Sequence, residues 1–234
     1  MTMTDPRGAG ATPRENGAAR ANLRWLCLIA TAAALAIAGV YLSLPWLHYA
    51  AKPAATLLIA AMVWRTRSSE PGYRAGILAG LLLSTLGDVF LMLHADFFAF
   101  GLASFLLAHL AYLFAFTRRE RLFAVAWPML AYAAAALMAL TVLWPELPQA
   151  LHMPVLVYIS ILATMAAQAA TVWRRRRDRA SALAAAGGLF FVASDSMLAI
   201  NQFVAPFAAS ALTVLATYWI AQSLIGLSTA RGET

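Results

Sequence analysis

Four ionisable residues stand inside stretches of sequence that are otherwise apolar. They are Lys52, Asp88, His109 and Asp195. An ionisable group inside a membrane span costs about 2.5–3.5 kcal/mol on insertion scales, so each one is by default a candidate for function. Lys52 is also the only lysine in a chain with sixteen arginines, and that choice invites a chemical reason. These four residues are the first candidates for a site.

The two aspartates and the lysine do not balance in charge. One ammonium group compensates one carboxylate, so a second carboxyl is left over if all three side chains meet. A buried carboxyl without a partner is a candidate general acid. The alternative is a buried ion pair between Lys52 and Asp88 or Asp195 that only fixes the packing of helices.

Membrane-spanning helices are the elements that must position these residues. Of the 234 residues, 62% are apolar and 12% are charged, which is more apolar than a soluble domain of this size needs to be. About 20 helical residues cross the hydrocarbon core. The apolar runs predict an all-α, polytopic membrane protein with eight transmembrane helices, at residues 24–44, 47–64, 75–93, 98–116, 122–143, 151–173, 182–200 and 207–227. The second span is the weakest, because Lys52 and Pro53 interrupt it.

The same reading divides the chain into three segments. Residues 1–22 are rich in Gly, Ala, Pro and Thr without an apolar period, so we expect a disordered cytoplasmic tail. Residues 23–228 form the eight-helix transmembrane domain, and residues 229–234 form a cytoplasmic C-terminal tail. No cleavage pattern follows the first apolar run, so we expect this span to remain in the mature protein. Cys27 is the only cysteine, which excludes an internal disulfide.

The arginines test the number of spans independently. With eight spans, all sixteen arginines fall on one side of the membrane, and the connections on the other side contain Asp96 and Glu146 but no lysine or arginine. Because cytoplasmic loops are enriched in Lys and Arg, this distribution predicts that both termini are cytoplasmic. We interpret the run at 174–177 as a topogenic signal that contacts anionic lipid head groups, and we expect no nucleic-acid partner. The expected location is the cell membrane, which is the inner membrane in a bacterium.

This topology gives a depth for each candidate residue. Lys52, Asp88 and Asp195 each lie about five residues from the outer end of a span, or roughly 7–8 Å below that edge at 1.5 Å per residue. Further polar residues follow at greater depth from the same side: His109, Tyr158, Tyr218, Thr164 and Gln222. The pattern predicts a polar pocket that opens toward the outer leaflet and is closed toward the cytoplasm.

Other chemistry is not indicated by the sequence. There is no HExxH or clustered His and Asp spacing, so we expect no metal, and we expect no other cofactor. Neither a glycine-rich nucleotide loop nor a GxSxG elbow occurs. Several glycines are instead expected to allow close approach of helices, namely Gly87, Gly101, Gly187 and Gly188.

Five segments of the chain form a combination that is specific as a set. They are AKPAATLL at 51–58, LLSTLGDVFLML at 82–93, GLASFLLAHLAYLFAF at 101–116, GGLFFVASDSMLAINQF at 187–203 and YWIAQSLIGLS at 218–228. In content and order this series resembles the YhhN family, which includes the TMEM86-like lysoplasmalogenases. The resemblance implies a membrane hydrolase of ether lipid metabolism. Such an enzyme cleaves the vinyl ether bond of a lysoplasmalogen and releases a fatty aldehyde and a glycerophospho-head-group.

The resemblance also implies roles for the polar residues. Asp88 and Asp195 would share the acid role and the base or stabiliser role, in an order that the sequence leaves open. Lys52 would keep one aspartate ionised or meet the phosphate of the substrate. The supporting residues would be His109, Tyr112, Ser194, Tyr218 and Gln222. The expected partners are a lysophospholipid substrate and membrane lipids, and the oligomeric state stays open.

Two other classes of function fit the same residues. A proton-coupled transporter or lipid flippase could use Lys52, Asp88 and Asp195 as a relay in a cavity. A passive lipid-binding or assembly protein would tolerate substitution of both aspartates. The segments TLGDVFLML and VASDSMLAI hint at a duplicated unit, but transporters and enzymes both use such repeats.

Overall fold

The computed structural model describes residues 13–93 and 95–230. Within these ranges the chain forms eight α-helices and no β-strand: α1 (Pro13–Tyr41), α2 (Pro45–Arg65), α3 (Pro71–Met92), α4 (Phe98–Thr117), α5 (Ala126–Leu143), α6 (His152–Arg176), α7 (Arg179–Ala199) and α8 (Ser210–Leu227). Short 3-10 turns lie at Ala95–Phe97, Trp144–Glu146 and Gln149–Leu151, and α7 continues into a π-helical turn at Ile200–Val204. The prediction of an all-α protein is confirmed.

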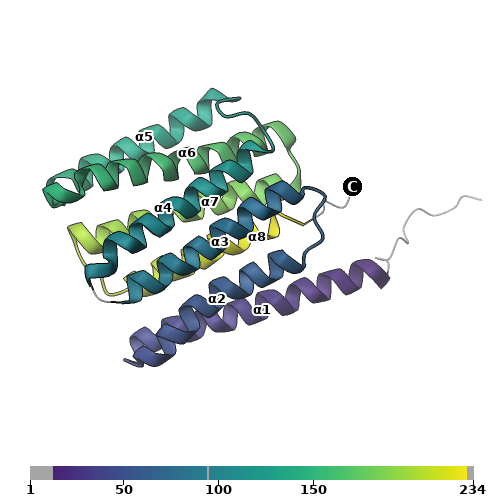
Figure 1. Ribbon diagram of the computed structural model, residues 1–234, viewed down its shortest axis with the longest axis horizontal. Helices are drawn as coiled ribbons and strands as arrows, with labels where there is room; N and C mark the ends of the chain where they lie inside the picture. The colour runs from purple at the N-terminus through teal and green to yellow at the C-terminus, as the bar shows by residue number, and fades with distance from the viewer. Residues whose placement is uncertain (1–12, 94, 231–234) are drawn as a thin grey trace, which may run out of the picture.

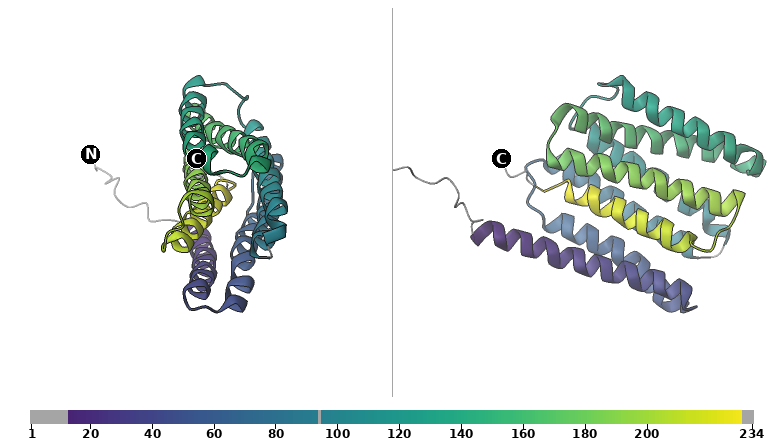
Figure 2. Two further views of the ribbon diagram at one scale, coloured as in Figure 1. Left: turned by 90° about the vertical axis from the view of Figure 1, so that its left-hand side faces the viewer. Right: turned by 180° about the vertical axis from the view of Figure 1, so that it is seen from behind.

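Six helices form the body of the bundle and two lie at its edges. In the body, α2 packs on α3 and α8, α4 packs on α3 and α6, and α7 packs on α6 and α8. Helix α1 packs mainly on α2 at one edge, and α5 packs mainly on α6 at the opposite edge (Figures 1 and 2). Of the residues of α5, only Pro128 and Leu143 are buried. This helix is therefore the most loosely packed part of the domain.

Helix α2 is the one element whose sequence argues against a span. In the described part of the chain, seven helices are long and apolar enough to cross a membrane, and α2 is not among them. It contains His48 and Lys52, and Pro53 lies inside it. The helix nevertheless runs unbroken from Pro45 to Arg65, because neighbouring helices in a membrane bundle can compensate for the backbone hydrogen bond that a proline removes. The prediction of eight helices is confirmed.

Helix α1 begins at Pro13, inside the segment that was predicted to be a disordered tail. This part of the sequence contains Ala, Arg, Glu and Leu, which favour helix, and it can extend an existing helix without a new nucleation step. Disorder stays a prediction for residues 1–12, which lie outside the described residues. The predicted C-terminal tail also lies largely outside them, at residues 231–234.

The connections that carry arginines meet at one end of the bundle. Glu70, just before α3, accepts hydrogen bonds from Arg119 Nε at 2.5 Å and from Arg176 Nη1 at 2.6 Å. The Arg119 guanidinium also lies 3.4 Å from the centre of the Tyr73 ring. Partial burial tends to raise the pKa of Glu70, but the hydrogen bonds and charges of Arg176 and Arg119 lower it below its ordinary value. Three connections distant in sequence are thus tied together on the predicted cytoplasmic side.

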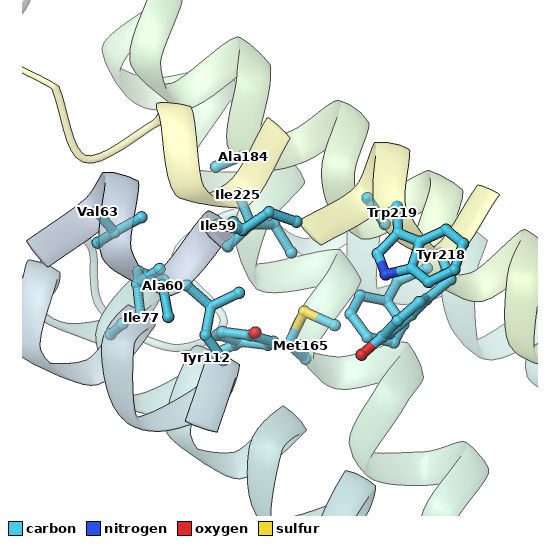
Figure 3. Packing of buried hydrophobic residues seen from close by; sticks show 14 of the residues in the cluster. Ile59, Ala60, Val63, Ile77, Tyr112, Met165, Ala184, Tyr218, Trp219 and Ile225 are labelled. Atoms are coloured by element: carbon cyan, nitrogen blue, oxygen red, sulfur yellow. The ribbon is translucent and has the colours of Figure 1, made fainter. Parts of the chain in front are cut away.

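A continuous apolar core fills the half of the bundle nearest these arginines. Its fully buried members include Ile59, Val63, Ile77, Tyr112, Met165, Ala184 and Ile225 (Figure 3). Tyr218 and Trp219 lie beside each other at the opposite end of this group, toward the half of the bundle away from the arginines, which is the predicted outer half (Figure 3). The core therefore closes the bundle beneath the level at which the charged residues lie.

Glycines let α3 and α4 approach closely. A methyl group added to Gly80 would overlap the ring of Tyr112, and one added to Gly87 would lie 2.7 Å from the ring of Phe105. In the other direction, a methyl group on Gly101 would lie 2.6 Å from Leu91. The predicted packing role of Gly87 and Gly101 is confirmed, and the close approach places Asp88 against the neighbouring helices.

Candidate active site

Lys52, Asp88 and Asp195 all line one cavity in the outer half of the bundle. The cavity has a volume of about 250 Å³ and lies among α2, α3, α7 and α8. Other polar residues that line it are His48, Tyr158, Ser194, Asn201, Ser210 and Tyr218. We refer to it as the polar cavity. Asp88 and Asp195 are 107 residues apart in the sequence, and both line this cavity.

Asp88 is the fully partnered carboxyl group of the pair. Its Oδ1 lies 3.5 Å from Lys52 Nζ, and its Oδ2 accepts hydrogen bonds from Thr56 Oγ1 at 2.9 Å and from Tyr218 Oη at 2.8 Å. Trp219 Nε1 in turn donates to Thr56 Oγ1 at 3.3 Å. The aspartate is 2% exposed. Helices α2 and α8 thus supply a cation and two hydroxyl donors to a single carboxyl group on α3.

Asp195 has different neighbours. Its Oδ2 accepts a hydrogen bond from Tyr158 Oη at 2.5 Å and lies 3.9 Å from His109 Nε2. In the described part of the chain, no lysine or arginine forms an ion pair with it. The His109 ring is held edge-on between Tyr158 and Phe191, and both of its nitrogens are buried without a hydrogen-bond partner. Asp195 is therefore held by a phenol from α6 and faces an imidazole from α4, and no lysine or arginine of the described residues pairs with it.

A second cavity adjoins the first. It has a volume of about 340 Å³ and lies among α5, α6, α7 and the outer end of α4, with walls made mostly of alkyl and aromatic side chains. We refer to it as the apolar cavity. Asp195 and Tyr158 line both cavities, as do Leu91, Phe105 and Leu198. Asp195 consequently stands at the boundary between a polar and an apolar compartment.

The supporting residues named from the sequence divide into two groups. Tyr218 and Ser194 line the polar cavity, although Ser194 Oγ donates to the carbonyl oxygen of Val214 at 3.0 Å, and His109 abuts Asp195. Tyr112 and Gln222 do not line either cavity. The Tyr112 hydroxyl donates to Gln222 Oε1 at 2.6 Å, and both side chains are fully buried in the core beneath.

Two contributors were missed from the sequence. Thr56 lies one helical turn after Lys52, so this spacing was a signal that both side chains lie on one face of α2, the face that the structure places against Asp88. Trp219 carried no such signal, because its indole N–H reaches Asp88 only through Thr56. Among the described residues, no group of three or more His, Cys, Asp or Glu side chains is placed to hold a metal ion.

Comparison with known proteins identifies the family of this chain. The model of the YhhN family matches residues 47–229, which is most of the chain. This range includes Asp88, Asp195 and the side chains that contact them. The chain belongs to the YhhN family. No solved structure matches this YhhN chain significantly.

Curated relatives of this YhhN chain are named as lysoplasmalogenases. Human lysoplasmalogenase TMEM86A is 33% identical over 156 residues, covering 65% of this chain and 64% of the relative. Human lysoplasmalogenase TMEM86B is 32% identical over 190 residues, covering 80% of this chain and 77% of the relative. The lysoplasmalogenase of Mycobacterium tuberculosis (strain CDC 1551 / Oshkosh) is 34% identical over 183 residues, covering 73% of this chain and 65% of the relative. The chain thus spans just under two thirds of the length of several relatives that it matches.

Proposed function

We propose that this YhhN-family protein is an integral membrane hydrolase that cleaves the vinyl ether bond of lysoplasmalogens. The observation that carries the proposal is a pair of buried carboxyl groups with unlike partners, one of them at the boundary between a polar and an apolar cavity. The names of the relatives supply the substrate class. Vinyl ether hydrolysis needs a proton donor and a group that stabilises positive charge, and two carboxyl groups provide both.

In the first step, Asp195 donates its proton to the β-carbon of the vinyl ether. The electron pair of the double bond forms the new C–H bond, and the positive charge is shared by the α-carbon and the ether oxygen. Asp195 is left as a carboxylate, which keeps the hydrogen bond from Tyr158. The carboxylate of Asp88 lines the same cavity and stabilises the cation, as one of the paired carboxylates does in glycoside hydrolases.

In the second step, one water molecule adds to the α-carbon and gives its proton to a carboxylate of the pair. The product is a hemiacetal. Its hydroxyl loses a proton as the bond between the α-carbon and the glycerol oxygen breaks, and the glycerol oxygen takes a proton. The sum is one water consumed, one fatty aldehyde formed and one free hydroxyl on the glycerophospho-head-group.

The neighbours of the two aspartates favour this order of roles. Lys52 supplies the counter-charge that a permanent carboxylate needs, and it does so for Asp88. Asp195 lies on the apolar side, where the double bond of the substrate must lie because it is the first part of the fatty chain. The core beneath the polar cavity is closed by Ile59, Ile77 and Ile225, an arrangement that suits an enzyme open to one side better than a transporter.

Aldehyde release from purified protein in lipid nanodiscs tests the proposal. We expect release from 1-alkenyl lysophospholipid and none from the 1-acyl lysophospholipid with the same head group. Asp195→Asn and Asp88→Asn should each lower the rate at least about a hundredfold, since general acid–base groups contribute about 10²–10⁴-fold. The control is Glu146→Gln, an exposed acid near the outer end of α5. Folded wild-type protein that releases no product from either lipid would overturn the proposal in favour of transport.

A further inference from the structure

We propose that the apolar cavity beneath α5 is the binding site for the hydrocarbon chain of the substrate, and that it sets which chain lengths the protein accepts. This proposal rests on the proposed function for the identity of the lipid. The cavity holds about 340 Å³ and shares Asp195 and Tyr158 with the polar cavity. A chain that fills it would therefore begin beside Asp195, where the double bond has to be protonated.

The shape of the cavity fits one fatty chain. Along α5 it extends from Tyr132 to Leu143, which is about 16 Å at 1.5 Å per residue. One leaflet of the hydrocarbon core, half of roughly 30 Å, has the same depth. Three of the α5 residues in the cavity wall have small side chains, Ala135, Ala136 and Ala139, and they leave space beside the larger residues of that wall.

The packing of α5 gives the chain a route from the bilayer. This helix packs mainly on α6 and on the π-helical turn Ile200–Val204, and it buries few of its own residues. Most of its surface must face lipid in the membrane. A single-chain lipid in the outer leaflet can therefore enter between α5 and the rest of the bundle without leaving the hydrocarbon.

Substitution of one alanine in the wall tests the assignment. Ala139→Phe projects a ring into the cavity, whereas Ala134→Phe makes the same change on the exposed face of the same helix, outside the cavity wall. Each methylene group of the substrate chain that is no longer buried lowers the affinity of the protein for the lipid about fourfold. We expect Ala139→Phe to lower kcat/KM for the longest chain of a 1-alkenyl series, relative to the shortest, by about tenfold or more. We expect Ala134→Phe to leave that ratio unchanged, and equal ratios in the two variants would overturn the proposal.

A binding measurement separates this proposal from the proposed function. A 1-alkyl lysophospholipid has a saturated ether that cannot be hydrolysed by this route, so its binding does not depend on catalysis. We expect it to raise the Tm of the wild type in nanodiscs, more strongly with a longer chain, and to lose this effect in Ala139→Phe but not in Ala134→Phe. An equal rise in Tm with added diacyl phospholipid would mean that the cavity holds ordinary membrane lipid, and the substrate site would be refuted. If no aldehyde is ever released but the length-dependent rise in Tm persists, the chain site stands and the proposed reaction falls.

Discussion

At the scale of residues, two identical side chains differ through their neighbours. Asp88 receives an ammonium and two hydroxyl donors, whereas Asp195 receives one phenol and faces a histidine. The sequence could predict the depth of these residues, because depth follows from counting along a helix. It could not predict which residues face each other, because that depends on how each helix is rotated. Tyr112 and Gln222 illustrate the limit, since they bond to each other in the core.

Removal of the lysine should separate its effect on stability from its effect on activity. Lys52→Met leaves Asp88 buried without a cation, and breaking a buried pair in this way costs about 3–5 kcal/mol. The double variant Lys52→Met with Asp88→Asn removes both charges and should recover most of that loss, while aldehyde release stays absent. Unfolding in denaturant, followed by circular dichroism, measures the stability. A double variant no more stable than Lys52→Met would contradict the pairing.

At the scale of elements, apolar length predicted every span to within four residues, apart from the early start of α1. The largest of the other differences are the start of α3, four residues before the predicted 75, and the start of α5, four residues after the predicted 122. Helix α2 was the uncertain element because of Lys52 and Pro53, and these residues do not end it. The relation between helices was harder to foresee. Small residues indicate that two helices come close, but they do not say which partner they meet or that α5 stands apart from most of the bundle.

A methyl group at the contact between α3 and α4 should destabilise the domain. Gly80→Ala forces a carbon atom into the ring of Tyr112, and overpacking of this kind typically costs about 1–3 kcal/mol. The matched control is Gly72→Ala on the same helix, where the added carbon would have Arg118 as its nearest neighbour at 3.4 Å, an ordinary contact. The Tm in detergent should fall for Gly80→Ala and change little for Gly72→Ala. Equal values for the two variants would show that the helices can adjust freely.

At the scale of the whole molecule, the arginines were the most informative residues. Their distribution predicted the number of spans, and the structure joins three of their connections through Glu70. What the sequence could not show is that these charges also hold the bundle together, because a topogenic signal needs no specific partner. The fold was thus more predictable than the hydrogen bonds that join its connections.

The hydrogen bonds from Arg119 and Arg176 to Glu70 should make the stability of the protein depend on pH. Its pKa is lowered in the folded protein from an ordinary value of 4.5, so its contribution is fully present above that value and is lost as pH falls through the lower folded pKa. Glu70→Gln should cost about 1–3 kcal/mol at neutral pH, as expected for charge-assisted hydrogen bonds, and this difference from wild type should vanish in strong acid. The control is Glu146→Gln, the substitution of an exposed acid, which should cost little stability at neutral pH. A difference that stays constant down to low pH would contradict the assignment.

In the reaction proposed above, the meeting of two unlike cavities at Asp195 would also determine where the products go. The proposed substrate is an amphiphile, and cleavage at the boundary would divide it into an aldehyde that prefers oil and a head group that prefers water. Each product would already lie in the cavity that suits it, so neither would have to cross the other cavity on leaving. The aldehyde would leave sideways past α5 into the bilayer, and the head group would leave on the side opposite the arginines. A cell that makes this protein would thereby remove a detergent-like lysolipid and keep its hydrocarbon chain in the membrane.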